Sequence, residues 1–438
     1  MRGRRFTYIA GVVALFFTAS PALASPGEVY GTSARSIARA GAVAADVRGF
    51  ESLHYNPSGL VQTERIELSA GYQYAIHKLS WESHIDGTPN VSGNSPTPEP
   101  HSIHVALAMP AGERLALGAY LSTMPTNFLR LRAGEPETPY FPYFENRAER
   151  VYLLLGVAAR FSEHVSFGLA LSLFSQVGGF ARAMEGPTRD VEPTLGINVR
   201  TLARVIFGLK VRIDDDSGIG FTFRQRFGIP YTVATQNAVG GVPFTVDVNA
   251  VGGQTPHQVI LGYFRNFGAL RAELDFGWYR NSRMKAPLVE VDADIVGIPI
   301  SSGEMDEPFK DSIDLRIGGE YTLGLPKKAR TLHLRGGVQY HTPMTREAVG
   351  PSNPLDGHKL GVALGGGIRF PFEGLAARAD LFFMTTGLVG RDNVKDPSKI
   401  FDESTAPGLQ TSNPGFSTIS GSGAVMALGL TLTLELPE

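Results

Sequence analysis

The sequence predicts an all-β protein, an antiparallel transmembrane β-barrel of about fourteen strands. Three observations predict it. Apolar residues alternate with small or polar residues along much of the chain, and the alternating segments are long. Long and short connections between these segments follow one another in a regular order. A strand that crosses a bilayer at a tilt needs about 9–11 residues, whereas strands of soluble proteins most often have about 5–6.

The composition excludes several other classes of protein. The 438 residues carry 40 Lys and Arg against 42 Asp and Glu, and this balance argues against a nucleic-acid partner. After residue 25 no apolar run reaches the roughly 20 residues of a membrane helix. Hydrophobic residues make up 43% of the chain, too many for a disordered protein. Because the chain has no cysteine, disulfides and thiolate metal sites are excluded.

The first residues have the pattern of a secretory signal. Arg2, Arg4 and Arg5 precede an apolar stretch at residues 8–19, and the Ala-Leu-Ala sequence at 22–24 matches a cleavage site. We expect residues 1–24 to be a signal peptide, so that the protein is exported. The alternative is a short N-terminal anchor helix, for which the apolar stretch is too short to span a bilayer.

Residues 25–63 precede the first strand and are rich in glycine and alanine. This stretch is too short to form a core of its own. We expect one short helix over Thr32–Val47, with Thr32 or Ser33 as its N-cap. A barrel of fourteen strands is too wide for its own side chains to fill. The sequence therefore predicts an N-terminal hatch at 25–63, inside a barrel formed by residues 64–438.

Two short motifs in this region carry a family resemblance. Residues 41–46 read Gly-Ala-Val-Ala-Ala-Asp, and residues 53–60 read Leu-His-Tyr-Asn-Pro-Ser-Gly-Leu. They resemble the hatch of the FadL/TodX-type long-chain fatty-acid and hydrophobic-compound transporters of bacterial outer membranes. The resemblance implies that a turn at Asn56, Pro57, Ser58 and Gly59 holds the hatch shut and shifts when ligand arrives. Alternatively, the turn only delivers the chain into the first strand. Ser58 replaces the usual alanine of the family.

The barrel strands follow from the alternation, which is clearest where Leu68, Ala70 and Tyr72 share one face and Ser69 and Gln73 the other. The expected strands are 64–76, 101–110, 113–122, 149–161, 164–176, 199–212, 218–229, 256–267, 269–281, 312–323, 331–341, 358–370, 375–385 and 423–436. Long connections are expected at 77–100, 123–148, 177–198, 230–255, 282–311, 342–357 and 386–422. Outer-membrane barrels have this rhythm of short turns at one end and long loops at the other. A soluble sandwich does not sort its loops in this way.

The apolar face of each strand should meet lipid, so the other face lines a lumen. That lumen face carries more arginines than acids. Many of these arginines can be structural, paired with Asp or Glu across strands. A surplus arginine can instead bind a ligand carboxylate through its planar fork. Arg204, Arg224 and Arg316 are our candidates, because they lie in the middle of their strands.

The predicted outer loops contain apolar residues that could capture a hydrophobic ligand. In the 123–148 loop the candidates are Phe128, Leu129, Leu131, Phe141 and Phe144. The alternative is that these side chains form the interfacial girdle or pack loop against loop.

The functional hypothesis is passive uptake of long-chain fatty acids or related hydrophobic compounds across the outer membrane of a Gram-negative bacterium. Outer loops would capture the ligand, the hatch-gated lumen would take it up, and it would leave sideways into lipid. The partners are the hydrophobic ligand and outer-membrane lipids. We expect a monomer with periplasmic termini, and neither a cofactor, a metal site nor a nucleic-acid partner. The alternatives are an aromatic-hydrocarbon channel of the same family, a lipase or protease barrel, for which no catalytic motif is found, and a structural or adhesion role.

Overall fold

The computed structural model describes most of the chain beyond the predicted signal peptide. The described residues are 29–84, 91–95, 99–123, 139–145, 151–185, 191–239, 242–285, 290–295, 298–301, 308–325, 330–350, 352–396 and 418–437. The signal peptide lies outside these ranges and stays a prediction. Within these ranges, no helix has both the length and the apolar character needed to cross a membrane.

Fourteen strands form a closed antiparallel barrel. They are β1 (Glu67–His84), β3 (His101–Pro110), β4 (Leu115–Thr123), β5 (Tyr152–Arg160), β6 (Val165–Glu185), β7 (Val191–Arg212), β8 (Ser217–Arg224), β11 (Gln258–Phe267), β12 (Leu270–Tyr279), β15 (Ser312–Leu325), β16 (Arg330–His341), β17 (His358–Phe372), β18 (Leu375–Val394) and β19 (Thr418–Glu435). The barrel closes where β1 pairs with β19, from Glu67 opposite Glu435 to His84 opposite Thr418. Each of the fourteen predicted segments overlaps one of these strands, so the predicted fold is confirmed.

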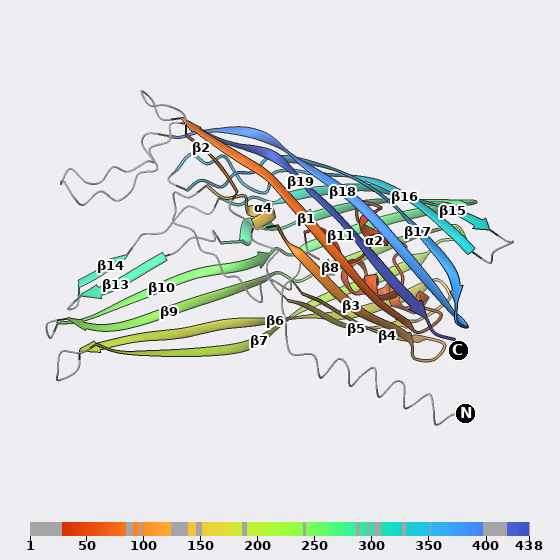
Figure 1. Ribbon diagram of the computed structural model, residues 1–438, viewed down its shortest axis with the longest axis horizontal. Coiled ribbons are helices and arrows are strands. Elements are labelled where there is room, and N and C mark those ends of the chain that lie inside the picture. The colour runs from red at the N-terminus through yellow and green to blue at the C-terminus, as the bar shows by residue number, and fades with distance from the viewer. Residues whose placement is uncertain are drawn as a thin grey trace.

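Five further strands lie in connections that were expected to be loops. They are β2 (Val91–Asn94), β9 (Phe227–Val239), β10 (Val242–Thr255), β13 (Glu290–Ile295) and β14 (Ile298–Ser301). The hairpins β6–β7, β9–β10 and β13–β14 extend well beyond one end of the barrel (Figure 1). The expected loops at 177–198, 230–255 and 282–311 are therefore wrong in part. The physical reason is that the hydrogen-bond ladders continue past the barrel wall, and β9 and β10 stay paired along nearly their whole length.

The two faces of the wall match the predicted alternation. On β12, Leu274 and Phe276 are exposed on the outside, whereas Glu273 and Asp275 are buried inside. The same alternation places Leu115 and Leu117 outside and Ala116 inside on β4. An apolar exterior around a polar interior is the arrangement of a barrel that crosses a bilayer.

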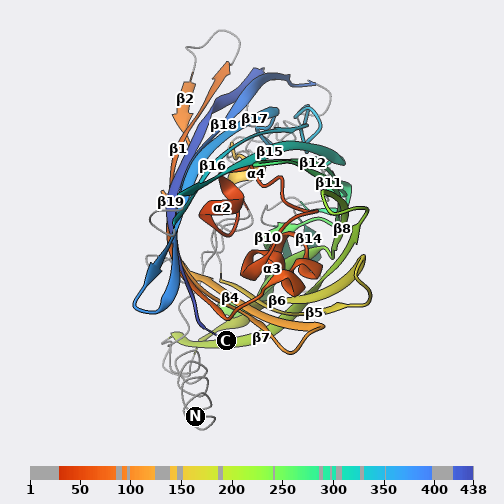
Figure 2. The same cartoon turned by 90° about the vertical axis from the view of Figure 1, so that its right-hand side faces the viewer.

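The N-terminal segment, residues 29–63, fills the interior of the barrel. It contains α2 (Ala34–Ile37), η2 (Gly49–Glu51), α3 (Ser52–Tyr55) and η3 (Pro57–Gln62), and Figure 2 shows α2 and α3 within the ring of strands. The expected single helix over 32–47 is wrong. Ser33 does cap α2 by accepting a hydrogen bond from Ser36 N, but positive φ angles at Ala40 and Gly41 end the helical path.

Two short helices in the connections between strands complete the fold. The first, α4 (Pro142–Glu145), lies in the connection between β4 and β5. The second, η4 (Asn281–Arg283), follows β12. Both lie at the end of the barrel opposite the paired ends Glu67 and Glu435.

Candidate functional site

Asn56 joins the N-terminal segment to itself and to the wall. Its Oδ1 accepts hydrogen bonds from Ser58 N at 3.2 Å and Ser58 Oγ at 2.7 Å. Its Nδ2 donates to Ala44 O at 2.7 Å and to Leu209 O of β7 at 3.1 Å. Pro57 follows at the first position of η3, where its missing N–H costs nothing. All four hydrogen-bonding positions of the amide are used, which requires Asn rather than Asp.

Glycines of the wall allow the Asn56-Pro57 turn to lie directly against the strands. Gly168 of β6 and Gly208 of β7 are opposite each other in register. A Cβ at Gly168 would overlap the backbone of Pro57 and Ser58, and one at Gly208 would overlap the Asn56 side chain. The excess of glycine in the sequence thus has a local cause here. The predicted gate residues Asn56, Pro57 and Ser58 therefore pack directly against the wall.

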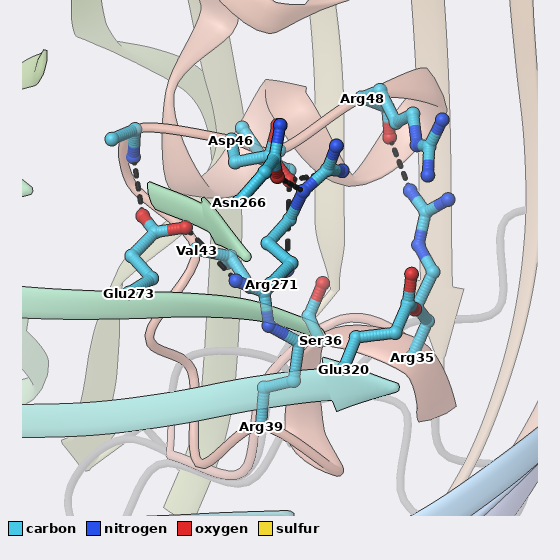
Figure 3. A network of polar contacts seen from close by, with 12 residues as sticks. Arg35, Ser36, Arg39, Val43, Asp46, Arg48, Asn266, Arg271, Glu273 and Glu320 are labelled. Atoms are coloured by element: carbon cyan, nitrogen blue, oxygen red, sulfur yellow. Dashed lines mark hydrogen bonds and ion pairs between the residues drawn. The ribbon is translucent and has the colours of Figure 1, made fainter. Parts of the chain in front are cut away.

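A second attachment is ionic. Asp46 forms an ion pair with Arg271 Nη1 at 2.7 Å. Two further cations lie near its carboxylate, Lys210 Nζ at 3.8 Å and Arg39 Nη1 at 3.9 Å. Figure 3 shows Asp46 and Arg271 together with Glu273 and Arg39, whose Nη2 lies 2.9 Å from Glu273 Oε2. Burial opposes ionisation of Asp46, but the three cations outweigh it and lower its pKa. Asp46 therefore remains charged at neutral pH.

Two acids of β12 also hold backbone amides of the segment. Asp275 Oδ2 accepts from Val43 N and Ala44 N, both at 3.0 Å, and Glu273 Oε1 accepts from Ala45 N at 2.6 Å. Because these amides point at one strand, the turn at 43–45 is fixed to the wall without an ion pair of its own.

A small cavity lies between the N-terminal segment and the wall. Its volume is about 40 Å³, little more than the roughly 30 Å³ that one water occupies in the liquid. Polar and aromatic side chains dominate its lining, which includes Tyr30, His54, Tyr55, Tyr143, Arg224, Gln258, Tyr279, Arg316, Gln339 and His341. The structure therefore brings two of the three predicted arginines, Arg224 and Arg316, to one cavity.

The two arginines of the cavity differ in their partners. Arg316 forms an ion pair with Asp314 at 2.5 Å and donates to the Tyr279 hydroxyl at 3.0 Å. Arg224 donates to Gln258 Oε1 at 2.8 Å and to His54 O at 2.5 Å. Among the described residues no carboxylate lies within ion-pair distance of Arg224, although it is only 5% exposed. A buried guanidinium with neutral partners is suited to an anionic ligand.

The third predicted arginine, Arg204, is buried next to this cavity but does not line it. It donates to Thr255 Oγ1 at 2.5 Å. His54 accepts a hydrogen bond from Arg224 through its backbone oxygen, and its Nδ1 is 2.7 Å from the Tyr152 hydroxyl. Burial, and then the positive charges of Arg224, Arg204 and Arg316, hold the pKa of His54 well below its usual value. His54 is therefore neutral at physiological pH.

Helix α4 covers the cavity from the end of the barrel where the hairpins extend. Tyr143 lines the cavity and packs edge-on against His341, with ring centroids 5.0 Å apart. Phe141 and Phe144 are buried in the same apolar cluster as Ile37 of α2. These two predicted capture residues are thus buried in the described conformation, because α4 folds inward, and their role in ligand capture stays a prediction. The other capture candidates, Phe128, Leu129 and Leu131, lie outside the described residues.

Comparison with solved structures identifies the architecture. The Pseudomonas putida toluene transporter TodX superposes with a TM-score of 0.58 at 12% identity, covering 94% of this chain and 100% of that one. A Pseudomonas aeruginosa FadL homologue gives 0.57 at 13%, covering 92% and 98%. The CymD monoaromatic hydrocarbon channel gives 0.57 at 14%, covering 94% and 99%. This chain has the FadL/TodX fold. No protein-family model and no curated protein sequence matches it.

Within this FadL/TodX fold, sequence reasoning missed most of the cavity. Tyr279, Gln258, Gln339 and His341 lie on strands of the wall, and their inward positions followed from the alternation. The sequence alone did not predict that these side chains meet at one cavity, because that depends on which strands face each other across the lumen. Among the described residues no group of three His, Asp or Glu side chains could hold a metal ion.

Proposed function

We propose that the protein lies in the outer membrane of a Gram-negative bacterium and takes up long-chain fatty acids or similar hydrophobic carboxylates. The N-terminal segment is its hatch, and the cavity with Arg224 is the internal binding site. Both termini are periplasmic, and the hairpins with α4 lie outside. The fold it shares with a FadL homologue and with TodX supports this assignment.

The partners of Arg224 are the observation that carries the choice of ligand. A carboxylate would replace neutral hydrogen-bond acceptors with a charged partner. A bare hydrocarbon would leave Arg224 with only its neutral partners, Gln258 Oε1 and His54 O. It would therefore forgo the roughly 1.5–3 kcal/mol that a hydrogen bond to a charged group contributes. The polar lining therefore favours an anionic amphiphile over toluene, the ligand named for TodX.

The size of the cavity implies that the described conformation is closed. At about 40 Å³ it cannot hold an acyl chain, so ligand binding must move α4, the hatch or both. The proposed path runs past α4 to Arg224, and then sideways to lipid once the hatch has shifted. No energy source is needed, because the ligand gains apolar surroundings at the end of the path.

Binding by the purified protein tests this proposal. Arg224→Met should weaken oleate binding about tenfold or more, since a hydrogen bond to a charged group is worth roughly 1.5–3 kcal/mol. Binding of oleyl alcohol should change little. Arg330→Met, at an exposed position on the periplasmic end of β16, is the control. Unchanged oleate binding by Arg224→Met would reject the carboxylate site. Toluene that displaces oleate equally well in both proteins would favour the aromatic-hydrocarbon alternative.

A further inference from the structure

A second pocket lies at the rim of the barrel and shares no lining residue with the first. Its volume is about 530 Å³, and its lining includes Lys310, Asp311, His358, Val389 and Arg391. It is formed by the hairpin-side ends of β15, β16, β17 and β18. Nothing in the proposed uptake path uses it.

The register shows that this pocket lies at the border of the apolar surface. Leu315, Tyr340 and Leu360 are opposite one another on β15, β16 and β17, and all three point outward. The next outward row includes His358, which is opposite Val389. The Tyr340 hydroxyl is 2.6 Å from His358 Nδ1. A tyrosine with an apolar ring and a bound hydroxyl is typical of the membrane–water interface. The pocket is therefore at headgroup level.

The charges of the pocket favour an anion. Among the described residues no carboxylate pairs with Lys310. Within the part of the chain that the structure describes, Arg391 donates only to uncharged oxygens, including Arg346 O at 2.6 Å and Asn393 Oδ1 at 3.3 Å. The one acid of the pocket, Asp311, already accepts from Ser282 N at 3.1 Å. Two cations thus share the pocket with one engaged carboxylate.

A β-bulge shapes the pocket. The register between β18 and β19 shifts between Leu388 and Arg391, so Val389 and Gly390 leave the ladder with β19, while Val389 stays opposite His358 of β17. This bend places Arg391 beside the ends of β16 and β17, where it meets Lys310 and His358 around one hollow. Bulges commonly re-aim a side chain in this way.

We propose that this pocket binds the phosphate of a lipid in the outer leaflet, whose acyl chains lie along Tyr340 and Leu360. Lys310 and Arg391 hold the phosphate, and the adjacent outward apolar row meets the chains. Cationic pockets beside membrane-spanning segments bind lipid headgroups in this manner. The inference rests on the outer-membrane placement but is independent of what the lumen carries.

Native mass spectrometry of the detergent-solubilised protein tests the site with diphosphoryl lipid A as the probe. Lys310→Gln should weaken binding about tenfold, and Lys310→Glu should abolish it. Arg265→Gln, which removes one exposed positive charge at the opposite end of the barrel, should have no effect. Heat-dependent gel mobility confirms that each variant keeps its barrel.

Two outcomes would overturn the proposal. Equal binding of the dephosphorylated lipid would show that phosphate is not recognised. The second outcome is that inorganic phosphate displaces the lipid at micromolar concentration and that Lys310→Gln weakens phosphate binding as well. This result would identify a site for free phosphate rather than for lipid. Competition only by the phosphorylated lipid, lost in Lys310→Gln, supports the assignment.

Discussion

At the scale of single residues, the contact of the hatch with the barrel wall depends on one functional group, the side-chain amide of Asn56. Its amide donates to two carbonyl oxygens, Ala44 O and Leu209 O, and accepts from Ser58 twice. A carboxylate of the same shape would keep the two acceptor contacts. It would place a negative charge against both carbonyls.

We therefore expect Asn56→Asp to loosen the hatch. The two lost donor contacts should cost about 2 kcal/mol or more, which is roughly a 30-fold shift toward the displaced hatch. Hydrogen exchange of the amides in residues 41–62 measures this shift as loss of protection. Asn266→Asp is the matched control. There the side-chain oxygen only accepts, from Arg271 Nε at 2.7 Å, so a carboxylate should be tolerated. Equal protection in wild type and Asn56→Asp would show that Asn56 does not hold the hatch.

At the scale of elements, α4 forms a cover that is attached on two sides. Tyr140 N donates to Asn353 O at 3.2 Å, and Leu355 N donates to Tyr140 O at 2.8 Å. On the other side Ser95 Oγ donates to Glu145 Oε1 at 2.6 Å. Between these attachments Phe144 is buried against the barrel interior. The cover is thus held by packing of aromatic rings as much as by hydrogen bonds.

Removing that packing should ease access to the cavity. Phe144→Ala deletes a buried aromatic side chain, which usually costs about 3–5 kcal/mol, and the loss falls on the closed position of α4. We expect faster association of oleate, measured by stopped-flow fluorescence, with a smaller change in dissociation. Phe161→Ala is the control, because Phe161 is 76% exposed at the short-turn end of the barrel. An association rate unchanged by Phe144→Ala would mean that α4 is not on the path.

The elements also show what the sequence could and could not reveal. The strands of the wall have two unlike faces, lipid and lumen, so their alternation is strong and each was predicted. Residues such as Val242, Phe244 and Val246 also alternate, but they lie in a segment that the rhythm of long and short connections assigns to a loop, whereas in the structure they pair in the β9–β10 hairpin. The helix predicted over 32–47 is too long because small residues allow a helix without requiring one, whereas Ala40 and Gly41 adopt positive φ angles, with Gly41 close to Arg316 of the wall.

At the scale of the whole molecule, the same limit applies to the site. Alternation predicted that Arg204, Arg224 and Arg316 point into the lumen. Which of these arginines has no carboxylate within ion-pair distance depends on pairs formed between strands, such as Arg335 with Asp380 at 2.6 Å. Those pairs are set by strand register and by the position of the hatch. Neither can be read from one strand alone.

The whole barrel should be stable without its hatch, because the wall closes through the β1–β19 ladder and not through the N-terminal segment. We expect deletion of residues 25–62 to raise single-channel conductance at least about tenfold, since a lumen of this strand number is too wide for its own side chains to fill. Heat-dependent gel mobility shows whether the deleted form keeps its barrel.

A full-length variant tests the same point if the deletion disturbs assembly. Gly208→Leu places a side chain where Asn56 and Pro57 now lie against the wall, so it should displace the hatch and raise conductance. Gly319→Leu is its control. Gly319 neighbours the inward Gly318, which abuts Arg39 of the hatch, so its own side chain would point outward. If both variants keep the low conductance of the wild type, the contact of Asn56 and Pro57 with the wall is not what keeps the lumen closed. In that case the ion pair of Asp46 with Arg271 would be the next attachment to remove.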